Sequence, residues 1–109
     1  MSTPTPAHAQ KARKLRLDLV PVEAIVGCAR AMQHGVDKGY PAWDWVGLDG
    51  WPDMYYAALL RHLLAWRRGE AIDPESGLSH LDHVLACAAI MRHRVATDGL
   101  SPPSEEPLP

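Results

Sequence analysis

The chain has 109 residues, 47% of them hydrophobic and 22% charged, which fits one folded domain and excludes a chain that is disordered throughout. Its formal net charge is −2, so the chain as a whole lacks the positive charge that favours binding to duplex nucleic acid or to an anionic membrane. No stretch approaches the roughly 18 apolar residues of a membrane span, and the N-terminus has no apolar signal segment, so we expect a cytoplasmic protein.

The two ends of the chain differ in composition from its middle. Residues 1–16 are rich in Pro, Ala and charge, which predicts a flexible basic N-terminal arm. Residues 98–109 contain four prolines, which cannot continue a helix and predict a disordered tail. Between them we expect a single helical metal-binding domain over residues 17–97. Its two cysteines, Cys28 and Cys87, lie in apolar helical patterns and are expected to be buried free thiols.

The first of three predicted helices follows Pro21, a residue suited to the first turn of a helix. Its apolar residues recur at intervals of three and four and form one stripe, at Val22, Ile25, Val26, Ala29 and Met32. Gly35 can end this helix, although residues 36–38 can also extend it.

A loop over residues 39–52 follows, and it holds three of the four tryptophans among glycines and prolines. Such a loop is longer than most connections inside a compact domain, so it is either functional or packed by its own side chains. Two interpretations stay open for its tryptophans: they anchor the loop to the core, or they form a lid over a ligand.

The second helix is expected to begin near Asp53, a good N-cap residue, and to end at Gly69. The third is expected to begin at residues 73–75, because Asp73 can cap a helix and Pro74 fits its first position. The core-facing stripe of this third helix is expected at Leu78, Leu81, Leu85 and Ala88. A tight turn makes the two helices antiparallel neighbours. Since no segment predicts a strand, the fold class is all-α, a small bundle of three main helices with a long Trp-rich loop.

Histidines and acidic residues gather in the last two predicted helices. His80 and His83 are three residues apart and share one helix face. Folding the second helix back on the third, about a turn near residue 72, brings His62 opposite this pair. Three acidic residues lie near the turn and one basic residue adjoins His62; they are Glu70, Asp73, Glu75 and Arg61.

Imidazole and carboxylate groups that converge between antiparallel helices are the ligands of a divalent metal site. The mixed set favours Mn, Fe, Co, Ni or Zn, whereas an oxygen-rich subset can hold Mg. Spacing alone leaves a structural or solvated role open for the histidines and a helix-capping role open for Asp73 and Glu75. The chain has no G-x-S-x-G, P-loop, G-x-G-x-x-G, C-x-x-C or H-E-x-x-H motif that would indicate other chemistry.

Several polar motifs follow one another in a fixed order. They are Arg61-His62, Gly69-Glu70, Asp73, Glu75-Ser76-Gly77, and His80 with His83, preceded by Lys14, Arg16, Asp18, Pro21, Gly35, Lys38, Tyr40 and Trp43. Over about residues 14–95 this pattern resembles the N-terminal domain of phage-type dATP/dGTP diphosphohydrolases. Gly39, which separates Lys38 from Tyr40, departs from the family pattern, in which Lys and Tyr are adjacent.

The resemblance implies hydrolysis of a purine deoxynucleoside triphosphate to the monophosphate and pyrophosphate, in the host cytoplasm if the gene belongs to a phage. The chain looks functionally similar to MazG-type helical pyrophosphohydrolases, which use acidic clusters and Mg. It lacks their E-x-x-E and E-x-x-D pairs, and His80 and His83 stand where the second pair would be. The implied cofactor is a divalent metal, Mg, Mn, Co or Zn, and its candidate ligands are His62, Glu70, Asp73, Glu75, His80 and His83.

The resemblance also implies roles for individual residues. Glu75 or Glu70 is the candidate general base. The candidates to bind phosphates are Arg61, Lys38 and Lys14, and the candidates to stack on the base are Trp43 and Tyr56. Because a three-helix core is small, we expect a homo-oligomer. The alternative is a non-catalytic phage or prophage accessory domain, in which the polar cluster is structural and the Trp-rich loop binds a protein partner.

Overall fold

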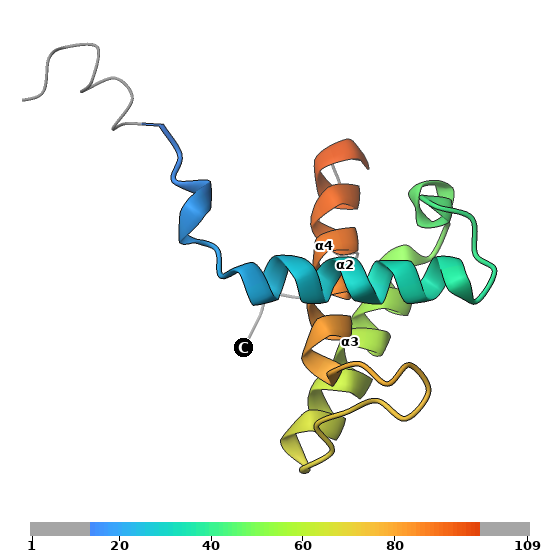
Figure 1. Cartoon of the computed structure of the whole chain (residues 1–109). Helices are drawn as coiled ribbons and strands as arrows, with labels where there is room; N and C mark the ends of the chain where they lie inside the picture. Colours follow the sequence, from blue (N-terminus) through green and yellow to red (C-terminus); the bar gives the residue numbers. More distant parts are fainter. Residues whose placement is uncertain (1–13, 99–109) are drawn as a thin grey trace, which may run out of the picture.

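The computed structural model describes residues 14–98 and consists of three helices: α2 (Val22–Asp37), α3 (Trp51–Arg67) and α4 (His80–Asp98) (Figure 1). Two short 3-10 helices precede α2 and α3; they are η1 (Leu17–Leu19) and η2 (Asp44–Gly47). Across residues 14–98 no strand forms, and only an isolated bridge joins Ile72 to Ser79. The all-α prediction is therefore confirmed. Most of the predicted N-terminal arm and of the Pro-rich tail lies outside the described residues.

Helix α4 packs against both other helices, and α2 crosses it (Figure 1). Arg94, near the end of α4, lies 5.4 Å from the ring of Trp51, which begins α3. His80, which begins α4, contacts His62 in the second half of α3. The pairing of an early residue with a late one in both contacts means that α3 and α4 run antiparallel, as predicted. None of the helices described is long and apolar enough to cross a membrane.

Small residues form the contact between α2 and α4. Gly27 and Ala31 are the buried residues of α2, whereas Val22 and Ile25 are exposed. A β-carbon placed on Gly27 would lie 2.1 Å from a carboxylate oxygen of Asp82 in α4, a distance that no real contact allows. The side chain of Asp82 thus lies against the backbone of α2 at Gly27 and must move to admit a larger residue. Much of the predicted apolar stripe of α2 faces solvent.

We expect Gly27→Ala to lower the free energy of unfolding by about 0.5–1.5 kcal/mol relative to Gly35→Ala, the cost of pushing the Asp82 side chain off its preferred rotamer. Gly35→Ala is the matched control, because Gly35 lies in the same helix and a β-carbon there meets nothing within 4 Å. That control should gain up to about 1 kcal/mol from the higher helix propensity of alanine. Urea unfolding of both variants measures the difference, and equal stabilities would contradict the close approach.

Two glycines end α2 and α3 in the same way. Gly39 has φ 108° and Gly69 has φ 104°, the left-handed conformation that terminates helices in a Schellman motif. The next residue then donates its N–H back into the helix: Tyr40 to the carbonyl of Gly35, and Glu70 to the carbonyl of Ala65. Helix α2 therefore ends two residues beyond Gly35. The glycine that departs from the family pattern is the one that fixes Tyr40 against the helix end.

Helix α3 begins at Trp51 rather than at Asp53. Gly50, with φ 72°, is the residue that precedes it, and Pro52 occupies the first turn, where a missing N–H has no cost. The predicted cap, Asp53, instead lies within the first turn, where its negative charge favours the positive end of the helix dipole.

Helix α4 begins at His80, so the predicted start at residues 73–75 is wrong. The side chain of Asp73 accepts hydrogen bonds from the N–H groups of Glu75 and Ser76, as a cap would. The chain does not continue as a helix, because Gly77 adopts φ 73° and the bridge between Ile72 and Ser79 turns the chain back on itself. What the sequence suggests as a helix start is therefore a closed loop.

The buried face of α4 also differs from the predicted stripe. Leu81 and Leu85 are each 36% exposed, and Ala88 is exposed as well. The buried residues are His80, Ala86, Cys87, Ile90 and Arg94. A face that includes a histidine and an arginine carries a weak apolar signal, which explains the wrong assignment. Cys87 is a buried free thiol, as expected, and burial raises its pKa to about 11; Cys28 is a half-buried free thiol.

Candidate functional site

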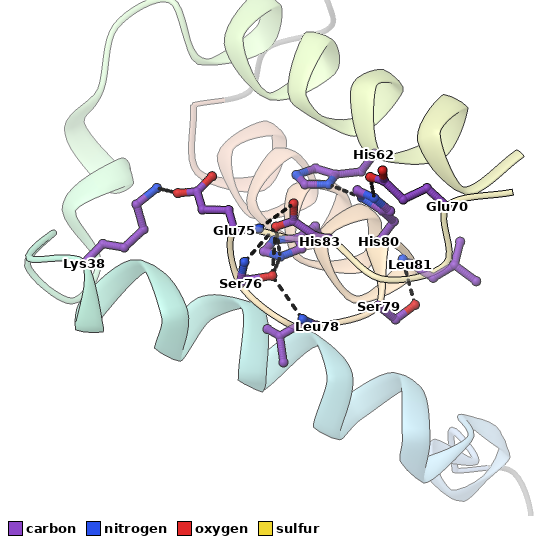
Figure 2. Close-up of polar contacts among 11 residues, drawn as sticks. Lys38, His62, Glu70, Glu75, Ser76, Leu78, Ser79, His80, Leu81 and His83 are labelled. Carbon is purple, nitrogen blue, oxygen red and sulfur yellow. Dashed lines mark hydrogen bonds and ion pairs between the residues drawn. The ribbon is translucent and has the colours of Figure 1, made fainter. Parts of the chain in front are cut away.

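One cavity of about 180 Å³ lies between the C-terminal half of α2, helices α3 and α4, and the connection between α3 and α4. Its lining residues are Ala31, His34, Gly35, Lys38, Tyr40, His62, Asp73, Glu75 and His83. They come from all three helices and from the connection over residues 68–79. Figure 2 shows the polar side chains of this region, with most of their contacts among the residues that the sequence singles out.

The connection between α3 and α4 is held in place by backbone hydrogen bonds. The N–H of Asp73 donates to the carbonyl of Leu78 at 2.8 Å, and the N–H of His80 donates to the carbonyl of Ala71 at 3.0 Å. The N–H of Gly77 donates to the carbonyl of Asp73 at 2.8 Å, which closes the inner turn. These bonds place Asp73 and Glu75 at the cavity without any regular secondary structure.

Asp73 is a buried acceptor at the centre of this loop. Besides the two N–H groups, the hydroxyl of Ser76 donates to its Oδ2 atom at 2.8 Å. Burial of Asp73 opposes its ionisation, but the hydrogen bonds from Ser76 and Glu75 outweigh burial and lower its pKa below the usual range. Asp73 is thus a carboxylate near neutral pH.

The bonds of Ser76 fix the protonation of His83. The Ser76 hydroxyl donates its single proton to the Asp73 carboxylate, so it accepts from Nε2 of His83 at 2.7 Å and from the N–H of Leu78 at 3.2 Å. Ser76 is therefore saturated and is not an activated nucleophile. His83 carries its proton on Nε2, which leaves the Nδ1 lone pair of the neutral ring without a role in this bonding.

A second chain of bonds links the other two histidines. Nε2 of His80 donates to Glu70 at 2.7 Å, and the Nδ1 atoms of His80 and His62 are 2.8 Å apart (Figure 2). One of these two Nδ1 atoms donates to the other, and the tautomers of the rings decide which. His80 is only 4% exposed and lies behind the cavity, where it orients His62.

The rings of His62 and His83 stack, with centroids 4.4 Å apart and planes within 10° of parallel. Burial lowers the pKa of each ring, and so does the charge of neighbouring imidazoles; for His62 the neighbour is His83. Both rings are thereby favoured in the neutral form, the form in which an imidazole accepts a proton or binds a metal.

Lys38 and Glu75 form an ion pair between the end of α2 and the connection (Figure 2). The contact raises the pKa of Lys38 and lowers the pKa of Glu75. Both side chains are well exposed, so solvent screens the pair and it contributes little to stability. An anionic ligand can therefore compete with Glu75 for the lysine at small cost.

A comparison with known families agrees with these motifs. The model of a family described as dATP/dGTP diphosphohydrolase, N-terminal, matches residues 4–100, which is most of the chain. The chain belongs to this family. Searches against curated proteins and against solved structures found no match. The comparison that bears on the site is therefore the match to the diphosphohydrolase N-terminal family.

Four of the residues assigned from the resemblance to the diphosphohydrolase N-terminal family do not line the cavity; they are Lys14, Trp43, Tyr56 and Arg61. Trp43 instead contacts Trp45 and His93, with ring centroids 5.1 and 5.6 Å away. Lys38, His62, Asp73, Glu75 and His83 do line it, while Glu70 and His80 lie directly behind His62.

Two lining residues with ring side chains, His34 and Tyr40, were not assigned a role at the site from the sequence. The ring of His34 meets the ring of His83 edge-on, with centroids 6.0 Å apart. His34 lies seven residues after Gly27 and three after Ala31, on the face of small residues that packs against α4. In the sequence, the small residues Gly27 and Ala31, rather than the large apolar residues, indicate which face of α2 is buried.

The donor set has the chemistry of a divalent metal site, since it combines imidazole nitrogens with carboxylate oxygens in one cavity. As the side chains lie, however, no group of three or more His, Cys, Asp or Glu among residues 14–98 is arranged to hold an ion. The donors are engaged with one another instead: His80 with Glu70, and His83 with Ser76. A metal ion in this member of the diphosphohydrolase N-terminal family therefore requires that some of these hydrogen bonds open.

Proposed function

We propose that this protein hydrolyses a purine deoxynucleoside triphosphate to the monophosphate and pyrophosphate, in the cytoplasm of the cell that expresses it. Membership of the diphosphohydrolase N-terminal family supports this activity. The observation that carries it is the cavity, which brings two neutral imidazoles, two carboxylates and a lysine to one place. In such a cavity the lysine can bind a phosphate while a carboxylate or an imidazole accepts a proton.

The phosphates enter this proposal at Lys38. The lysine is held by the exposed Glu75, and a triphosphate carries more negative charge than a single carboxylate. Exchange of the carboxylate for a phosphate frees Glu75 at the edge of the cavity. Glu75 is then one candidate to accept a proton from the attacking water, and the free Nδ1 lone pair of His83 is another.

A divalent metal is the proposed cofactor, held by a subset of His62, Glu70, Asp73, Glu75, His80 and His83. Such an ion supplies charge stabilisation on phosphate oxygens and lowers the pKa of bound water. The protein side chains contribute orientation: Glu70 and His80 hold the ring of His62, and Ser76 holds the ring of His83. These partners select which ring nitrogen is available to a ligand.

Incubation of the pure protein with each dNTP, in turn with Mg, Mn, Co and Zn, tests the proposal. We expect monophosphate and pyrophosphate from dATP or dGTP, resolved by anion-exchange chromatography, and no product without added metal. Release of orthophosphate or of a nucleoside would require a different reaction. Absence of any turnover with all four metals and all four nucleotides would contradict the proposal.

A non-catalytic accessory domain is the second candidate. It is favoured by the completeness of the polar network, because no buried side-chain nitrogen or oxygen in the described part of the chain lacks a hydrogen-bond partner. Trp43, 63% exposed in the Trp-rich loop, is then available to a protein partner. The incubation above separates the two candidates.

The expected self-association also stays a prediction. Val22 and Ile25 of α2 are exposed apolar residues that a second copy of the chain would cover.

A further inference from the structure

The cavity is too small for a whole nucleotide. Its volume of about 180 Å³ is below the roughly 300–1,000 Å³ of pockets that enclose a drug-sized ligand. Its walls are mostly charged or titratable, with Lys38 as the basic residue and imidazoles beside it. Lys38, together with a divalent cation on the carboxylates of Asp73 and Glu75, would suit phosphate groups, whereas these charged walls would not suit a base. If phosphates occupy the cavity, the base must therefore lie at its rim.

Tyr40 stands at that rim and is the aromatic residue, apart from histidines, that lines the cavity. It is 59% exposed, so much of its ring is open to a ligand. Its ring centroid is 5.9 Å from Nζ of Lys38, which places an aromatic face beside the cation that the proposed function assigns to phosphate. A nucleotide with its phosphates on Lys38 thus brings its base towards Tyr40.

The backbone holds Tyr40 in this position. Gly39 supplies the left-handed turn, and the N–H of Tyr40 donates to the carbonyl of Gly35 at 3.1 Å. The ring is therefore attached to a capped helix end rather than to a free loop. The tryptophans differ: Trp43 packs on Trp45 and His93 at another part of the fold.

We propose that Tyr40 is the platform on which the base of the nucleotide stacks, while the triphosphate occupies the cavity beside Lys38. This inference rests on the proposed function, because it assumes a nucleotide in the site. It assigns base recognition to Tyr40, directly after the end of α2, and leaves Trp43 and Trp45 of the same loop outside the site. An aromatic face accepts any base, so stacking on Tyr40 adds affinity for a nucleotide over a bare phosphate chain.

The test compares binding of two probes by calorimetry, a non-hydrolysable α,β-methylene analogue of dATP and inorganic tripolyphosphate. We expect Tyr40→Ala to weaken binding of the analogue about tenfold, the usual scale for loss of one base stack, and to leave tripolyphosphate binding unchanged. Tyr40→Phe keeps the aromatic face and should bind both probes like the wild type. Tyr56→Ala is the matched control, because Tyr56 is equally exposed at 60% but does not line the cavity.

Unchanged binding of the analogue by Tyr40→Ala would overturn the inference, and so would an equal loss for both probes, since that reports a distorted cavity. Loss on Tyr56→Ala but not on Tyr40→Ala would place the base on α3 instead. If the wild-type protein binds the analogue but cleaves no dNTP, the proposed function fails. The inference about Tyr40 can still hold in that case, because the Tyr40 variants still show whether the base stacks there. A wild-type protein that binds neither probe would overturn both.

Discussion

Arg94→Met is expected to lower the free energy of unfolding by about 3 kcal/mol, the largest stability effect among the substitutions considered. Arg94 is 6% exposed, and its guanidinium donates to the carbonyl oxygens of Trp45 and Leu48 at 2.6 and 2.9 Å. It also donates twice to the carboxylate of Asp98. Methionine keeps most of the volume but leaves these acceptors without a donor, and hydrogen bonds to a charged group are worth about 1.5–3 kcal/mol each.

Arg92→Met is the matched control, because Arg92 is exposed and lies on the same helix two residues away. It should change stability by no more than about 0.5 kcal/mol. Arg94→Lys should fall between the two, since lysine keeps the charge but not the forked donors. Urea unfolding measures all three. If Arg94→Met and Arg92→Met unfold at the same urea concentration, the loop carrying Trp45 is not held to α4 by this side chain.

The meeting of the histidines was predictable from the sequence because it depends on few assumptions. The sequence predicts a tight turn near residue 72, which would bring residues at equal distances from it face to face; the structure has a longer connection over residues 68–79, which still leaves the two helices antiparallel. His62 and His80 lie 10 and 8 residues from residue 72, within one helical turn of this condition, and their ring nitrogens are 2.8 Å apart. This argument depends little on where each helix begins. The predicted contact between His62 and His80 is therefore confirmed, although α4 begins seven residues later than expected.

The features that were missed depend on exact distances rather than on pattern. Asp73 carries the sequence signal of a helix cap and uses it in a closed loop, because Gly77 in the left-handed conformation prevents the helix from forming. The contact of Gly27 with Asp82 lies between segments 55 residues apart, and no local periodicity reports it. His34 and Tyr40 reach the cavity from α2 and from the residue after Gly39, a placement that no local pattern reports.

His83→Gln is expected to reduce dNTP turnover at least about 100-fold, in the range typical of a lost acid–base group or metal ligand. His83 lines the cavity and its Nε2 atom is committed to Ser76, so its remaining function at the site lies with Nδ1. A glutamine amide can donate to Ser76 in place of Nε2 but offers no second ring nitrogen. The substitution thus separates the hydrogen bond to Ser76, which a glutamine can keep, from the second ring nitrogen, which it lacks.

His93→Gln is the control of the same chemistry, because His93 lies against Trp43 and Trp45 and does not line the cavity. It should keep turnover within about twofold of the wild type. Thermal unfolding of both variants shows whether the fold is retained, and chromatography of the products gives the rate. A folded His83→Gln protein with wild-type turnover would remove His83 from the reaction and leave Glu75 as the candidate base. A parallel loss in both variants would instead indicate that any change along α4 disturbs the site, since the two residues share that helix and nothing else.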